Sequence, residues 1–150
     1  MPTADDIETA DRLTRRRARM LPVLAIIFLT QQASYFAAVV EEGSRDVDHV
    51  KIGAWLILSI VMLLALTTGG FWFKPARIRA LMDDEVTRAN RTEAFRIGFL
   101  VTMIAAIGLY FITLFEPVSG REAIHILMTL GLAAALLRFG FLERRALKYG

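Results

Sequence analysis

Apolar residues gather into four long blocks along the chain, separated by short polar segments. The blocks cover residues 20–40, 52–73, 95–115 and 123–142. Each block is about twenty residues long, which as a helix rising about 1.5 Å per residue matches a hydrocarbon core about 30 Å thick. A soluble core helix would carry a polar face, and these blocks do not. The pattern predicts an all-α integral membrane protein, a single domain of 150 residues folded as a four-span helix bundle.

Basic residues alternate with the blocks. Fifteen of the 18 lie before the first block, in the connection 74–94 and its flank, or in the C-terminal part from Arg138 onward. The other two connections hold Arg45, Lys51 and Arg121. Because basic residues accumulate in cytoplasmic loops, this alternation predicts that both termini lie in the cytoplasm. Trp55 would then lie near the outer end of the second span, at the level of the headgroups.

Two polar segments outside the spans also have helical patterns. Residues 1–19 read as a cytoplasmic amphipathic helix on the inner membrane surface that runs into the first span. In the cytoplasmic connection 74–94, Pro75 suits a helix start and Ala76–Met82 reads as a short helix. The acidic residues that follow favour a new helix start, from which the chain continues as helix into the third span.

The stretch Leu81–Arg91, with the sequence LMDDEVTRANR, resembles a segment of small bacterial membrane proteins of unassigned function. Those proteins have four spans, with an acidic and then basic stretch of this type just before the third. The resemblance implies a location in the bacterial inner membrane and brings no activity with it.

The same connection predicts a cytoplasmic partner surface. Its residues are Asp83, Asp84, Glu85, Arg88, Asn90 and Arg91. The alternative is a solvated helical extension whose arginines contact anionic lipid headgroups.

A second candidate site is a polar group near the middle of the first span. It consists of Thr30, Gln31, Gln32, Ser34 and Tyr35. All of these except Gln32 share one helical face, with Gln32 toward the opposite side. Amides in hydrocarbon need partners, so this face should point into the bundle or into a neighbouring subunit. Its role is either contact between helices or a small pocket for a substrate.

A third candidate lies toward the outer side. It consists of Asp46, Asp48, His49, Glu116 and His125, whose oxygen and imidazole ligands suit a divalent cation. The alternative is that acidic residues remain on the outer loops only because the basic residues gather on the cytoplasmic side.

The absence of cysteine removes thiolate sites, and no catalytic motif is found, so neither a cofactor nor an enzyme activity is predicted.

Small residues predict where helices approach each other. In the fourth block Gly131 and Ala135 lie on one face, whereas Thr129 and Gly140 lie on another. Two such faces suggest contacts within the bundle and across an oligomer interface.

The first functional hypothesis is a non-enzymatic, oligomeric scaffold or regulatory subunit acting through its basic cytoplasmic face, with a soluble partner. The alternatives are a small transporter or channel subunit and, more weakly, an outer-face cation sensor. A nucleic-acid partner is not favoured, because orientation explains the arginines.

Overall fold

A computed structural model describes residues 3–39, 45–70 and 75–149, with the side chains of residues 34–39, 45–49, 51 and 77 outside that description. Five helices make up most of the described chain, and it contains no strand, which confirms the all-α prediction. The helices are α1 (Ala4–Val39), α2 (Arg45–Thr68), α3 (Ala76–Met82), α4 (Glu85–Ile112) and α5 (Gly120–Tyr149).

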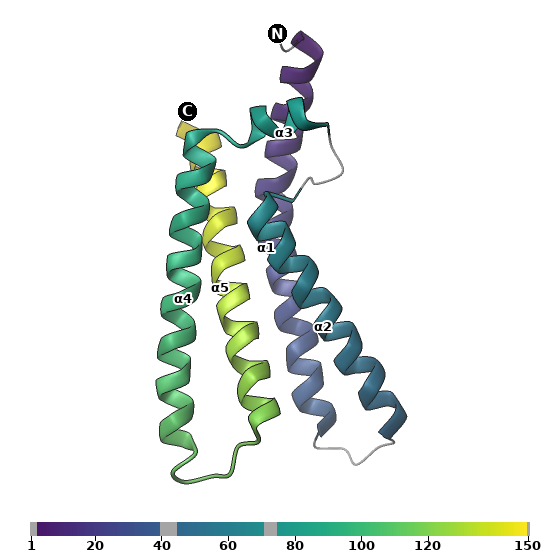
Figure 1. Ribbon diagram of the computed structural model, residues 1–150, viewed down its shortest axis with the longest axis vertical. Helices are drawn as coiled ribbons and strands as arrows, with labels where there is room; N and C mark the ends of the chain where they lie inside the picture. The colour runs from purple at the N-terminus through teal and green to yellow at the C-terminus, as the bar shows by residue number, and fades with distance from the viewer. Residues whose placement is uncertain (1–2, 40–44, 71–74, 150) are drawn as a thin grey trace.

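The four long helices run along one another, and α5 makes the most extensive contacts, first with α4 and then with α1 (Figure 1). The short helix α3 packs against α1. The start of α1, the end of α5 and all of α3 lie at one end of the bundle, which we call the terminal end (Figure 1). The starts of α2 and α5 lie at the opposite end.

Local sequence explains where these helices begin and end. The Asp84 side chain accepts a hydrogen bond of 2.7 Å from the backbone N–H of Thr87, which caps α4. Ser119 and Glu122 form a reciprocal capping box before α5, and the hydrogen bond from the Ser119 backbone N–H lowers the pKa of Glu122. The predicted helix over Ala76–Met82 and the continuous helix into the third block are confirmed. Residues 4–19 form the first part of α1, which continues as one helix into the first apolar block as predicted.

Close contact between α4 and α5 depends on small residues. A Cβ added to Gly98 would lie 2.9 Å from the Ala135 Cβ and 2.9 Å from the Gly131 carbonyl oxygen. The core continues from this contact through Ala94, Leu136 and Phe139 to Leu21 and Ala25 of α1 and to Met62 and Leu66 of α2. The face of α5 that carries Gly131 and Ala135 is therefore used within the chain.

Two of the described helices, α4 and α5, are long and apolar enough to cross a membrane. The apolar part of α2, Ile52–Thr68, is shorter. A buried helix of a soluble protein would pass the same test of length and composition. In α4, however, only 6% of the most apolar window is buried, against 39% in α5, so α4 presents an apolar surface to its surroundings.

The contact between α1 and α5 is built around a proline. Pro22 has no N–H, so the carbonyl of Ala18 one turn earlier loses its usual helical donor. The Arg144 Nε of α5 donates to that carbonyl oxygen at 2.9 Å. One turn earlier on α5, Gly140 leaves room for the proline ring, because an added Cβ would lie 2.6 Å from Pro22 Cδ. Both faces of α5 that carry small residues thus contact helices of the same chain.

Replacing Arg144 by Met should destabilise the protein by about 1 kcal/mol, because the Ala18 carbonyl loses its donor. In a Pro22→Ala background the loss should be much smaller, since residue 22 then supplies its own N–H to Ala18. Unfolding in detergent of the parent protein, the two single variants and the double variant gives the coupling free energy between Pro22 and Arg144. Arg145→Met, at an exposed neighbouring position, is the matched control. An equal cost of Arg144→Met in both backgrounds would rule out this explanation.

Candidate functional site

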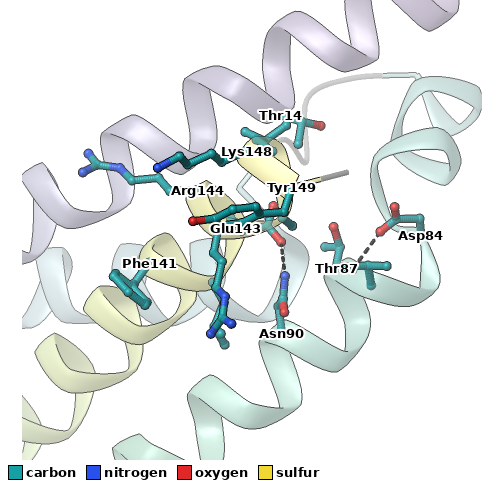
Figure 2. A pocket seen from close by; sticks show the side chains of 14 residues that line it. Thr14, Asp84, Thr87, Asn90, Phe141, Glu143, Arg144, Lys148 and Tyr149 are labelled. Carbon is teal, nitrogen blue, oxygen red and sulfur yellow. Dashed lines mark hydrogen bonds between the residues drawn. The ribbon is translucent and has the colours of Figure 1, made fainter.

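The terminal end of the bundle contains a buried ion pair between Arg17 of α1 and Glu143 of α5. Their side chains are only 3% and 2% exposed. Arg17 also donates to the Thr87 hydroxyl at 3.1 Å, and its guanidinium carbon lies 5.5 Å from the centre of the Phe139 ring. Asn90 of α4 donates to the second Glu143 oxygen at 3.1 Å (Figure 2). We call Arg17, Thr87, Asn90 and Glu143 the ion-pair cluster.

Burial makes this cluster sensitive to the loss of one partner. Moving two charges out of water is costly, and their attraction offsets that cost only when hydrogen bonds satisfy the remaining polar atoms. Thr87 and Asn90 supply two of these bonds. The cluster therefore fixes α1, α4 and α5 relative to one another.

A second set of contacts holds the connection from α2 to α4. Arg91 of α4 donates to the Thr67 carbonyl oxygen in the last turn of α2 at 3.1 Å and to the Asp83 carboxylate at 2.6 Å. Arg88 donates to the other Asp83 oxygen at 3.2 Å. Gly69, with a positive φ of 74°, ends α2 between Arg17 and Arg91, and an added Cβ would lie 3.2 Å from each guanidinium.

These contacts also set the charge of Asp83. Burial raises the pKa of the Asp83 carboxyl, but the charge of Arg91 and the hydrogen bonds from Arg88 and Arg91 outweigh burial and hold it below its usual 3.8. Asp83 is therefore ionised at neutral pH, and its contribution to stability is lost only as the pH falls below 3.8.

Toward the opposite end, a polar chain links three helices inside the bundle. His125 Nε2 of α5 lies 2.5 Å from the Gln32 Oε1 of α1. The Thr129 hydroxyl donates to the same oxygen at 3.3 Å and accepts from the Trp55 Nε1 of α2 at 3.3 Å. The Trp55 and His125 rings stack with centres 3.9 Å apart. Trp55 is thus buried inside the bundle against His125.

The structure places the residues of the predicted polar group of the first span on different sides of α1. Gln32, expected on the opposite side, is the residue that faces the bundle, whereas Thr30 is exposed and donates to the Ile26 carbonyl of its own helix at 3.0 Å. The reason is spacing, because Gln32 continues the buried series formed by Ala18, Leu21, Ala25 and Phe28. Gln31 is half-buried, and the side chains of Ser34 and Tyr35 lie outside the described residues.

The predicted cytoplasmic partner surface is likewise divided. Asp84 caps α4, while Asp83, Asn90 and Arg91 bind other parts of the same chain. Glu85 is exposed, and the Arg88 side chain is 69% exposed. Of the predicted surface, Glu85 and Arg88 are therefore exposed, and Arg88 is also paired with Asp83.

The outer-face cation site has little geometric support in the described part of the chain. Glu116 is exposed, whereas His125 points into the bundle against Gln32. The side chains of Asp46, Asp48 and His49 lie outside the described residues. Among the residues that are described, no group of three potential ligands could hold a metal ion.

Comparison with protein-family models, curated proteins and solved structures finds no match.

Glu143 is not among the predicted site residues, and Arg17 enters the prediction only through the orientation of the chain. A signal for Glu143 was present, because it is the single acidic residue after Glu122 and stands beside Arg144 and Arg145. It also lies four residues after Phe139, on the buried face of α5. An acid at such a position predicts a buried basic partner.

Replacing Glu143 by Gln should cost about 3–5 kcal/mol of unfolding free energy, because it leaves the Arg17 charge buried and unpaired. The double variant Arg17→Met/Glu143→Met should recover at least half of that loss, since it removes both charges. Denaturant unfolding in detergent measures both. Arg88→Gln breaks an exposed pair and should cost less than about 1 kcal/mol. If Glu143→Gln lowers the unfolding free energy no more than Arg88→Gln does, the ion-pair cluster does not hold the three helices together.

Proposed function

We propose that the chain is a four-span protein of the bacterial inner membrane with both termini in the cytoplasm. The outward face of α4 supports this proposal. It carries exposed large apolar side chains, including Phe99, Met103, Ile104, Ile107 and Phe111. In water each buried square ångström of such a surface would gain about 25 cal/mol, so a soluble monomer would not leave this face uncovered.

The remaining spans of the proposal are α1 from residue 20 onward and α2. Both run beside α5, and the bundle has the basic N-terminal part of α1, α3 and the end of α5 together at its terminal end (Figure 1). Many exposed basic side chains lie there. They include Arg12, Arg15, Arg16, Arg19, Arg79, Arg88, Arg145 and Lys148. In the proposed orientation this end is cytoplasmic.

The proposed role is that of a non-enzymatic scaffold or regulatory subunit that binds a soluble, acidic partner at this basic end. One observation carries the proposal: Arg91 binds both the end of α2 and Asp83, while Arg88, in the first turns of α4, is 69% exposed. A charged residue on such a helix is presented without the ordering cost of a flexible loop, which favours binding. Self-association stays a prediction, and the outward face of α4 is one apolar surface available for it.

Site-specific photo-crosslinking tests this role. A photoreactive residue at the exposed position Ala89, next to Arg88, should cross-link to a soluble protein in intact cells. The cross-link should fall at least fivefold with Arg88→Glu, because charge reversal repels an acidic partner.

Two controls make the result specific. A photoreactive residue at Ile107, on the outward face of α4, should capture no soluble protein. Arg121→Glu reverses an exposed arginine at the opposite end and should leave the Ala89 cross-link unchanged. An unchanged cross-link in Arg88→Glu, or none at Ala89 in the parent protein, would contradict the scaffold role.

A further inference from the structure

Two grooves adjoin on the surface of α5 near the terminal end. The smaller one has a volume of about 390 Å³ and is lined by Pro22 of α1 and by Leu137, Arg138, Phe141 and Arg144 of α5. The larger one, toward α4, shares Phe141 and Arg144 with it (Figure 2). The smaller groove combines three apolar side chains with two guanidinium groups, and its described lining contains no carboxylate.

Both arginines retain hydrogen-bonding capacity. A guanidinium has five N–H donors. Arg144 uses its Nε and Nη2 for the carbonyl oxygens of Ala18 and Arg19. Arg138 donates from Nη2 to Glu93 at 3.3 Å, and its buried Nε has no partner among the described residues. The groove therefore has an excess of cationic donors and lacks acceptors.

The depth of the groove points to its ligand. Pro22 and Arg138 both stand near the terminal ends of their proposed spans, at the level where headgroups meet hydrocarbon. A ligand at this depth that satisfies guanidinium donors and also covers Leu137 and Phe141 has a phosphate next to an acyl chain.

We infer that this groove is a binding site for one anionic phospholipid of the cytoplasmic leaflet. Arg138 and Arg144 bind its phosphate, and Leu137, Phe141 and Pro22 contact its glycerol and first acyl carbons. The inference rests on the proposed membrane topology. It adds a lipid that bridges α1 and α5 at the contact made by Pro22, Gly140 and Arg144.

Thermal unfolding in detergent tests the site. Phosphatidylglycerol at about ten times its Kd should raise Tm by about 3–5 °C over the same amount of phosphatidylcholine. Arg138→Gln should lose at least half of this difference. Arg96→Gln is the matched control, because Arg96 also pairs with Glu93, at 3.9 Å, but does not line the groove. Comparing the two lipids within each variant removes any general change in stability.

A second variant guards against failure of Arg138→Gln to fold. Leu137→Glu places an acid at an exposed position in the groove and should abolish the preference for phosphatidylglycerol. Equal effects of the two lipids on the parent protein, or an equal loss in Arg96→Gln and Arg138→Gln, would overturn the site. Inorganic phosphate at matched ionic strength should leave Tm unchanged, and a shift equal to that of the lipid would show a phosphate site only.

Fractionation of lysed cells before detergent is added separates the two proposals. Protein that fractionates with membranes but shows no preference for phosphatidylglycerol contradicts the lipid site alone. Protein that does not fractionate with membranes contradicts both the topology and the lipid site.

Discussion

The ion pair between Arg17 and Glu143 joins the first and last long helices at the end where both chain termini lie. Thr87 and Asn90 of α4 each add one hydrogen bond to it, and Gly69 at the end of α2 packs against the Arg17 guanidinium. All four long helices therefore meet around one buried charge pair. Because such a pair tolerates little displacement, it fixes the register of the bundle and the position of the basic surface around it.

The second constraint is that polar groups inside the bundle must find partners there. Gln32, His125, Thr129 and Trp55 bind one another across three helices. Where Pro22 removes a donor, Arg144 of another helix replaces it. Contacts of this kind suit a protein whose outer surface faces lipid, since lipid offers no hydrogen bonds, although the Gln32 Nε2 has no partner among the described residues.

Much of the fold could be predicted from the sequence, because helix starts and apolar blocks depend on local residues. The helix Ala76–Met82 and the capping of α4 by Asp84 are examples. Which face of a helix is buried depends on its neighbours, and there prediction was weaker. Gln32 rather than Thr30 faces the bundle, and Trp55 stacks on His125 inside it. The Arg17–Glu143 pair was missed because its partners are 126 residues apart.

The central claim is that the ion-pair cluster lies at the cytoplasmic end of a four-span bundle. The chain has no cysteine, so single cysteines can report sidedness directly. Two positions for cysteine, Ala80 and Tyr149, are exposed at the terminal end. A third, Gly120, is at the opposite end, and a Cβ added there meets no atom within 4 Å. A membrane-impermeant maleimide should label only Gly120→Cys in right-side-out spheroplasts, and all three after solubilisation. Labelling of Ala80→Cys in intact spheroplasts would contradict the account.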